Sequence, residues 1–352
     1  MIVVHIESGL GNQMLGYLEY LAIKQENPDE ECYIETIVYE LGEKQNVINM
    51  WNGYELESVF GIKAPNIRDI IDENIWDRII SHVEKSEFWN HNWSYPEAIT
   101  KAFAEEGYWL ENRCKSYGSP IRNKEKNIKS QMKIFGKNCF NGKPFAYYCK
   151  LKETVQFYSN DRRMDHSKDL FPNHLNNVYC GFTLNFSKTG YGIEKLELDP
   201  VKIFRFPELQ KKENIEMAKK LRTGNSVAIH ARRGDLLTFN GVFYKNGYFK
   251  QATKIIRKNI LNPEFYFFSD PGSVDWCKKN LDIFGLDCKK DVIHFIDWNK
   301  GNENYRDMQL MTMCKANIIT NSSFGWWGAY LNCNPHKITV SPGHRILTTH
   351  HC

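Results

Sequence analysis

The stretch VAIHARRGD occupies residues 227–235 and decides how the chain is expected to fold. Its apolar first half is typical of a buried strand, and His230, Arg232, Arg233 and Asp235 follow where that strand ends. The planar fork of an arginine side chain matches the oxygens of a phosphate group. Because adjacent side chains on a strand point to opposite faces, we expect only one of the two arginines to reach a ligand. The alternative is an ion pair between an arginine and Asp235 that closes the loop.

Short apolar segments alternate with helical patterns on both sides of this stretch. Strands are predicted at 226–231, 264–269, 292–298, 317–321 and 337–341, and helices at 248–259, 273–280, 303–315 and 324–331. This alternation indicates a parallel sheet that is buried on both faces. Ligands of such sheets bind at the carboxyl ends of the strands, where Arg232, Asp270 and Ser322 fall.

The N-terminal part of the chain begins with a second strand–loop–helix unit. A predicted strand at 2–6 precedes the loop GLGNQM (9–14), and a helix follows to about residue 25. Glycines permit close approach of the backbone to a phosphate, and the helix N-terminus adds N–H donors. An ordinary turn between strand and helix is the alternative. The amides of Asn12 and Gln13 have no evident structural need, which favours a functional loop.

The chain as a whole is expected to be an α/β protein with two Rossmann-like domains. A second N-terminal strand is predicted at 32–39, and a polar helix at 207–224 links the halves. We therefore place one domain at 1–210, with an irregular insertion at about 66–207, and a second at 211–352. A helix-like apolar pattern at 70–83 is the clearest feature of that insertion.

Composition excludes several classes of protein. The chain has 352 residues with 42% hydrophobic and 25% charged residues, as in globular proteins, and its net charge of +4 gives no reason to expect nucleic acid as a partner. No window contains the roughly 18 apolar residues that span a bilayer, and no secretory signal is visible. The ten cysteines are scattered without metal-ligand spacing, so we expect reduced thiols in a cytoplasmic protein that contacts the inner face of a membrane at most peripherally.

Two further loops carry polar side chains that allow more than one interpretation. Asp270 follows a predicted strand and can bind a guanine base or cap the next helix, and capping is slightly favoured. The hydroxyls of Ser322 and Ser323 can likewise bond a phosphate or cap the helix at 324–331. Trp326 and Trp327 are expected in the core. No histidine cluster or DxD pair is present, so no metal is predicted, and arginine and helix N-termini would stabilise a leaving diphosphate.

Four motifs in this order resemble those of glycosyltransferase family 11, the α-1,2-fucosyltransferases. The motifs are GLGNQM (9–14), HARRGD (230–235), FFSDPGSVDWCK (267–278) and DMQLMTMCKANIITNSSFGWWGAYL (307–331). The resemblance implies a GT-B fold, in which two Rossmann-like domains face a central cleft. It further implies metal-independent, inverting transfer of L-fucose from GDP-β-L-fucose, without a cofactor, to O2 of a terminal galactose in a glycan such as an O-antigen.

The resemblance also implies roles for individual residues. Arg232 would neutralise the β-phosphate, His230 and Asp270 would hold the guanosine, and Ser322 and Ser323 would bond phosphate oxygens. Gly11, Asn12 and Gln13 would face the cleft from the N-terminal domain. The sequence departs from the usual family wording in the first helix, MLGYLEY, at the SDP of 269–271 and at GWWGAYL (325–331). These departures bear on the donor and the acceptor more than on the fold.

Two carboxylates in or next to these motifs, Glu7 and Asp235, could serve as general base. Departure of the leaving group ahead of deprotonation would make a strong base unnecessary. Three other functions remain open: transfer of another GDP-deoxysugar, transfer of fucose to a different hydroxyl, and a non-catalytic protein that binds a nucleotide or a glycan.

Overall fold

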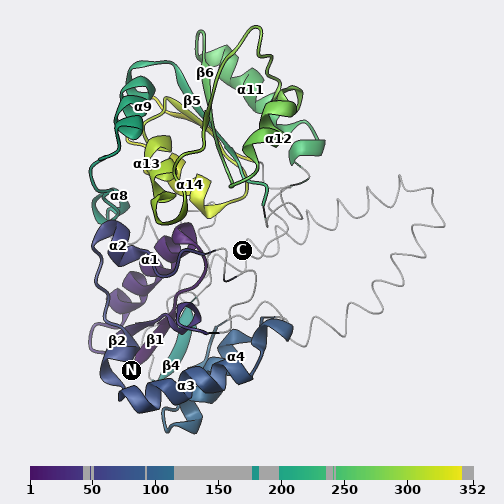
Figure 1. Ribbon diagram of the computed structural model, residues 1–352. Helices are drawn as coiled ribbons and strands as arrows, with labels where there is room; N and C mark the ends of the chain where they lie inside the picture. Colours follow the sequence, from purple (N-terminus) through teal and green to yellow (C-terminus); the bar gives the residue numbers. More distant parts are fainter. Residues whose placement is uncertain are drawn as a thin grey trace, which may run out of the picture.

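Two parallel β-sheets form the framework of the protein (Figure 1). The computed structural model describes residues 1–42, 48, 51–91, 93–114, 177–181, 198–234, 241 and 243–342. The N-terminal sheet has the order β2-β1-β4-β3 and contains β1 (Ile2–His5), β2 (Cys32–Glu35), β3 (Glu111–Asn112) and β4 (Val178–Gly181). The C-terminal sheet has the order β7-β6-β5-β8-β9 and contains β5 (Ser226–Ala231), β6 (Glu264–Ser269), β7 (Val292–Ile296), β8 (Ala316–Ile318) and β9 (Ile338–Val340). Each described strand pair is parallel, which confirms the predicted α/β architecture.

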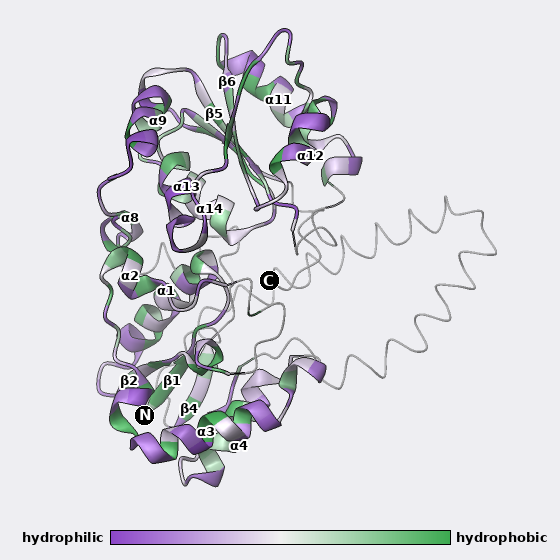
Figure 2. Ribbon diagram, viewed as in Figure 1, coloured by the Kyte–Doolittle hydropathy of each residue, from purple (hydrophilic) through white to green (hydrophobic). Residues whose placement is uncertain are grey.

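Helices cover both faces of the N-terminal sheet because its strand residues alternate between two apolar clusters. Val3 packs with residues of α3 (Glu73–Lys85) and α4 (Tyr95–Glu105), whereas Ile2 and Val4 pack with residues of α1 (Leu10–Glu26). The other helical elements in the described part of this half are α2 (Leu56–Phe60) and the short 3₁₀ turns Ile37–Tyr39, Ile67–Ile70 and Phe88–Asn90. Parallel strands buried on both faces consist mainly of hydrophobic residues, as Figure 2 shows in green at β1.

The C-terminal sheet has the same layered packing. Val227 and Ile229 pack beside α11 (Tyr248–Asn259), while Ala228 lies on the opposite face with residues of α9 (Lys212–Thr223) and α14 (Ser323–Tyr330). The remaining helical elements are α8 (Pro200–Ile203), α12 (Val274–Lys279), α13 (Tyr305–Met311), Leu281–Phe284 and Gly301–Glu303.

Predicted and observed element bounds agree best in the C-terminal sheet. β5, β6 and α11 have the predicted limits, and the polar helix predicted at 207–224 is α9. The strand predicted at 32–39 ends at Glu35, where the side chain accepts a hydrogen bond from the backbone N–H of Ile37 and a 3₁₀ turn begins. That local bond turns the chain out of the sheet.

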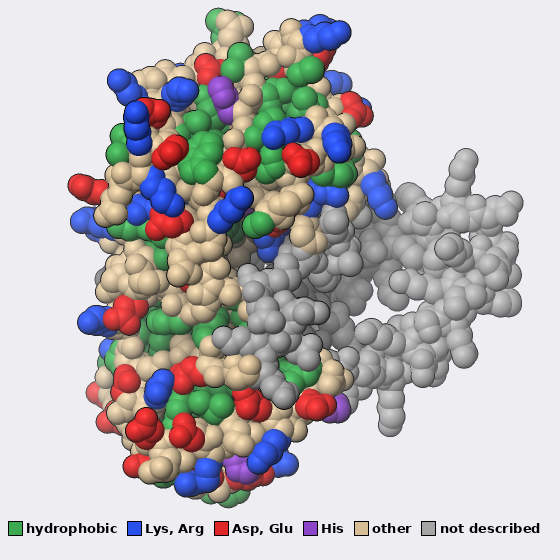
Figure 3. Space-filling model, in the orientation of Figure 1, with side chains coloured by type: hydrophobic (Ala, Val, Ile, Leu, Met, Phe, Trp, Pro, Cys, Tyr) green, Lys and Arg blue, Asp and Glu red, His purple; other side chains and the backbone are tan. Residues whose placement is uncertain are grey.

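The two halves meet where α1 approaches α14, between the two sheets in Figure 1. A hydrophobic cluster joins Leu10 and Met14 of α1 to Trp327 of α14, and Trp327 is fully buried as predicted. Figure 3 shows acidic and basic side chains interspersed over one face of the molecule. None of the described helices is long and apolar enough to cross a bilayer. The seven cysteines in the described part of the chain are free thiols.

Candidate active site

The carboxyl end of β5 lies at the point where the strand order of the C-terminal sheet reverses. From β5 the chain continues to β6 and β7 on one side, and β8 and β9 lie on the other. A crevice at such a point is the usual ligand site of an open α/β sheet. The topology brings His230, near the end of β5, and Arg232, which follows it, to the edge where the loop leads from β8 to Ser322 and α14.

Asp270 organises the loop that carries the arginines. One carboxylate oxygen is ion-paired with the Arg232 guanidinium, and the other accepts hydrogen bonds from the backbone N–H groups of Arg233 and Gly234. The carboxylate does not cap α12, which has no side-chain cap, so the favoured capping interpretation is wrong. The arginine therefore pairs with Asp270 from the neighbouring strand. Asp235 lies outside the described residues.

The two adjacent arginines have different environments. The guanidinium of Arg233 lies 3.3 Å from the ring centroid of Trp276 and 5.2 Å from that of Tyr244, so its charge is held by aromatic faces. The side chain of Arg232 stays 30% exposed at the end of the strand. Arg233 is thus held by the protein itself, and the contact of Arg232 with a ligand stays a prediction.

His230 is buried beside the first turn of α14. Burial, opposed by the charge of Asp270 and reinforced by that of Arg232, lowers the pKa of His230 to about 4, so the ring is neutral at neutral pH. Its Nδ1 atom has no hydrogen-bond partner among the described residues. The ring stacks on Phe324 at 5.7 Å and occupies the space in which a Cβ at Gly325 would lie.

The amide of Gln13 serves the N-terminal framework. Its nitrogen donates to the carbonyls of Ser8 at 2.9 Å and Gly53 at 2.8 Å, and its oxygen accepts from the N–H of Glu55 at 2.7 Å. The side chain is fully buried. The inference that this amide has no structural need is wrong, because it fastens the loop after β1 to residues about 40 positions away in sequence.

Asn12 and Gly11 instead connect the two halves. Asn12 Nδ2 donates to Ser8 Oγ at 3.0 Å, and Asn12 Oδ1 accepts a hydrogen bond of 2.5 Å from Ser323 Oγ. The Trp327 indole N–H donates to the Gly11 carbonyl at 2.9 Å. A Cβ at Gly11 would lie 2.6 Å from the backbone nitrogen of Phe324, so only glycine permits this approach. The structure thus brings the predicted loops together.

Ser322 is the N-cap residue of α14 but makes no side-chain capping bond. The N–H groups of the first helical turn have no intrahelical partners, and the helix dipole makes this end positive. This end of α14 is therefore a source of positive potential at the edge of the sheet, in addition to the Arg232 guanidinium. The arrangement suits an anionic ligand.

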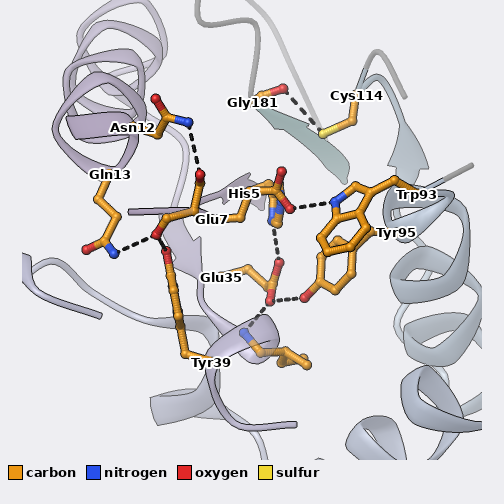
Figure 4. Close-up of polar contacts among 12 residues, drawn as sticks. His5, Glu7, Asn12, Gln13, Glu35, Tyr39, Trp93, Tyr95, Cys114 and Gly181 are labelled. Atoms are coloured by element: carbon orange, nitrogen blue, oxygen red, sulfur yellow. Dashed lines mark hydrogen bonds and ion pairs between the residues drawn. The ribbon is translucent and has the colours of Figure 1, made fainter. Parts of the chain in front are cut away.

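A buried ionic cluster beside the loop was not predicted from the sequence (Figure 4). His5 Nδ1 lies 3.0 Å from Glu35 Oε2, and His5 Nε2 lies 3.2 Å from Glu7 Oε2. Burial alone would lower the pKa of His5, but the hydrogen bonds and charges of Glu35 and Glu7 outweigh it and raise the pKa to about 9. The available signal was a pair of charged residues at the ends of two adjacent apolar strands, since His5 and Glu35 are partners in the β1–β2 register.

Comparison with known proteins places the chain in a family. The family model described as glycosyl transferase family 11 matches residues 145–343. The chain belongs to glycosyl transferase family 11. The matched range includes the C-terminal sheet with Arg232, Asp270 and Ser323, and it begins after the loop that contains Asn12.

Curated relatives in this family carry names that refer to sugar transfer. An α-1,2-colitosyltransferase of Escherichia coli is 35% identical over 133 residues, which make up 36% of this chain and 43% of that protein. The O-antigen biosynthesis glycosyltransferase WbnK of Escherichia coli is 32% identical over 34% of this chain and 38% of its own length. Galactoside α-(1,2)-fucosyltransferase 1 of Bos taurus is 34% identical over 31% of this chain and 30% of its own length. The chain thus spans less than half the length of these relatives.

Among the described residues, no group of three or more His, Cys, Asp or Glu side chains is arranged to hold a metal ion. The groups that the site presents in this part of the chain are therefore the Arg232 guanidinium, the first turn of α14 and the carboxylates near His5.

Proposed function

We propose that this family 11 chain transfers L-fucose from GDP-β-L-fucose to O2 of a terminal galactose, with inversion at the anomeric carbon. The observation that carries the proposal is the arrangement at the carboxyl edge of the C-terminal sheet, where Arg232 follows β5 and α14 follows the neighbouring strand β8. The names of the relatives, which specify α-1,2 transfer of fucose or colitose, support the linkage.

The proposed chemistry depends on the departure of a diphosphate. Negative charge develops on the β-phosphate as the bond to the sugar breaks, and Arg232 and the N–H groups of α14 would stabilise it. Asp270 holds the Arg232 guanidinium and the backbone of its loop in place before substrate arrives. Because both Asp270 oxygens already accept hydrogen bonds, its predicted contact with guanosine stays a prediction. Because the Arg232 guanidinium and the start of α14 would both stabilise the leaving phosphate, we favour a reaction that needs no metal ion.

We further propose that the two sheets belong to the two domains of a GT-B arrangement, with the boundary near residue 210. The substrates would then meet between the loop at Asn12 and the edge that carries Arg232. The hydrogen bonds of Ser323 to Asn12 and of Trp327 to Gly11, which join α14 to this loop, support the arrangement.

A second candidate is transfer of a different GDP-deoxysugar. The name of the Escherichia coli colitosyltransferase favours this alternative. Parallel assays with GDP-fucose and GDP-colitose distinguish the two donors, and the proposal requires the higher kcat/KM for GDP-fucose.

An acceptor screen tests the proposed activity. The protein is incubated with GDP-fucose and lactose, N-acetyllactosamine or a Galβ1-3 disaccharide, with and without EDTA, and products are assigned by NMR. We expect GDP release that depends on the acceptor, an α-1,2 linkage, and no effect of EDTA. Tight GDP binding without transfer to any galactoside would instead indicate a non-catalytic binding protein.

Substitution of Arg232 provides the first residue-level prediction. Arg232→Ala should lower kcat by about 100-fold or more because it removes a positive group that stabilises the leaving phosphate. Steady-state kinetics measures the loss, and circular dichroism checks that the variant is folded. Arg233→Ala should mainly lower the melting temperature, because it removes the contact with Trp276. Equal kinetic losses in the two variants would overturn the assignment.

A further inference from the structure

Glu7 presents one free carboxylate oxygen at the carboxyl end of β1. Its Oε2 atom lies 3.2 Å from His5 Nε2 and accepts a hydrogen bond of 2.9 Å from the indole of Trp93. Among the described residues, no donor reaches Oε1, although the side chain as a whole is only 4% exposed. Unlike the unpartnered Nδ1 atom of His230, Oε1 of Glu7 is not sealed off from solvent. Figure 4 shows this oxygen pointing away from His5.

The remaining acceptor capacity of the cluster lies on Glu7. Glu35 is fully buried, and its oxygens accept from Ile37 N–H, from Tyr95 Oη at 2.7 Å and from Tyr179 Oη at 2.9 Å, in addition to His5. Glu35 therefore has little remaining capacity as an acceptor. Glu7 retains an open acceptor, and His5 beside it carries a positive charge because the pKa of His5 is raised to about 9.

Aromatic side chains adjoin this carboxylate. Trp93 meets Trp51 edge to face at 6.1 Å, and Trp51 meets Tyr39 in the same manner at 6.1 Å. Both tryptophans are partly exposed. Asn52, the next residue, donates to the carbonyl of Gly301 in the C-terminal half, so this aromatic group lies near the junction of the halves. An oriented polar acceptor among partly exposed rings is a typical composition of a small-molecule site.

The position of Glu7 relates it to the proposed donor site. The following residue, Ser8, accepts a hydrogen bond from Asn12, and Asn12 in turn accepts one from Ser323 at the start of α14. Glu7 is thus separated from the first turn of α14 by a short chain of hydrogen-bonded side chains. Its free oxygen lies on the N-terminal side of the junction, opposite the residues proposed to hold the diphosphate.

We propose that Glu7 Oε1 binds the attacking hydroxyl of the acceptor sugar, with Trp93 and Trp51 as the apolar wall of the acceptor subsite and with His5 and Glu35 as positioning residues. This inference rests on the proposed function. The hydroxyl oxygen forms a bond to the anomeric carbon, and the bond from that carbon to the β-phosphate oxygen breaks with its electron pair leaving on GDP. The hydroxyl proton passes to Glu7 and from there to solvent.

Glu7→Gln tests the proposal by removing the base while keeping the shape. We expect kcat for a galactoside acceptor to fall at least about 100-fold while the Kd for GDP, measured by calorimetry, stays within about twofold. Azide is an anionic nucleophile that needs no base, so the variant should form fucosyl azide from GDP-fucose. Glu57→Gln, on the exposed side of α2, is the matched control and should retain wild-type rates. Galactoside transfer at the wild-type rate by Glu7→Gln would overturn the proposal.

Variants of the neighbouring residues separate positioning from folding. Trp51→Ala should raise the acceptor KM about tenfold with little change in kcat, because it removes apolar wall area without touching the carboxylate. His5→Gln should shift the acid limb of the pH–rate profile to higher pH, because loss of the imidazolium charge makes Glu7 easier to protonate. An unshifted profile would contradict the positioning role.

Failure of the proposed function has a different signature. If the wild-type protein transfers no sugar from either donor, the activity is wrong, and saturation-transfer NMR with lactose then tests the subsite by itself. Binding that Trp51→Ala abolishes would support the subsite, and absence of lactose binding to the wild-type protein would overturn it.

Discussion

His5 shows how one buried side chain can couple stability to pH. It lies between Glu7 and Glu35, is 2% exposed, and is protonated at neutral pH because the two carboxylates outweigh the cost of burial. A histidine whose pKa is raised in the folded state stabilises the fold below its unfolded pKa, and that stabilisation is lost as pH rises through the folded pKa. For His5 the window extends from about 6.5 to about 9.

We therefore predict that wild-type protein loses stability relative to His5→Gln over this window. The free energy of unfolding of the wild-type protein, minus that of His5→Gln, should fall by roughly 3 kcal/mol between pH 6 and pH 9.5, as the raised pKa of His5 implies. Urea unfolding of both proteins at several pH values measures it, and taking the difference cancels the titration of tyrosines and cysteines common to both. A difference that does not change with pH would show that the pKa of His5 is the same in the folded and unfolded protein.

At the residue scale, the sequence predicted side chains more reliably than their partners. Strand geometry predicted that the two adjacent arginines would have different environments, and the structure places Arg233 on Trp276. The sequence offered Asp235 as a local partner for an arginine but gave no signal for the ion pair of Arg232 with Asp270, which follows the adjacent strand. Such contacts depend on strand order, which local sequence does not contain.

At the scale of single elements, His230 restricts which residue can stand in the first turn of α14. Gly325 leaves the space that the His230 ring occupies, and a Cβ there would overlap Nδ1. The ring is packed against Phe324 and is 5% exposed, so it has little freedom to move away. The first glycine of GWWG, Gly325, is thus required by the packing of α14 against His230 of β5.

Gly325→Ala is accordingly expected to destabilise the protein by about 1–3 kcal/mol, the usual cost of overpacking a buried site. Thermal and urea unfolding measure the change. The double variant His230→Ala/Gly325→Ala should lose less stability than the sum of the two single variants, because removal of the ring relieves the overlap. Additive losses would show that the two sites are independent.

The elements that sequence predicted best are those whose signals are local. β5 and β6 are short apolar runs bounded by polar residues, and α11 repeats its buried residues Phe249, Ala252, Thr253 and Ile256 at helical spacing. The end of β2 was predicted too late because the determining interaction is the bond of the Glu35 side chain to Ile37. The role of Gln13 was missed for a related reason, since its partners are distant in sequence.

At the scale of the whole molecule, the contact of Gly11 with α14 sets how closely the halves approach. The neighbouring atoms are the backbone of Ser323 and Phe324, which cannot give way as a flexible side chain would. The Asn12–Ser323 and Trp327–Gly11 hydrogen bonds depend on this approach. The fold class and the family motifs were predictable, but this contact was not.

Gly11→Ala should force α1 and α14 apart and break both hydrogen bonds. We expect faster hydrogen exchange at the start of α14 and a fall in transfer rate of about tenfold or more, as misplacement of reacting groups by about 1 Å can produce. Gly9→Ala is the control, because nothing lies within 4 Å of a Cβ at that position of the same loop. Unchanged exchange and turnover in Gly11→Ala would contradict the role of this contact.

The meeting of backbone with backbone at Gly11 and Phe324 also restricts relative motion of the two sheets. Sliding of one half along the other would drive the two chains into each other, whereas rotation about this point leaves the contact intact. Any relative motion of the halves would therefore be a rotation about the loop after β1 and the first turn of α14. Such a rotation would break more distant contacts, such as the Asn52–Gly301 hydrogen bond, while Asn12 and Ser323 stay almost stationary.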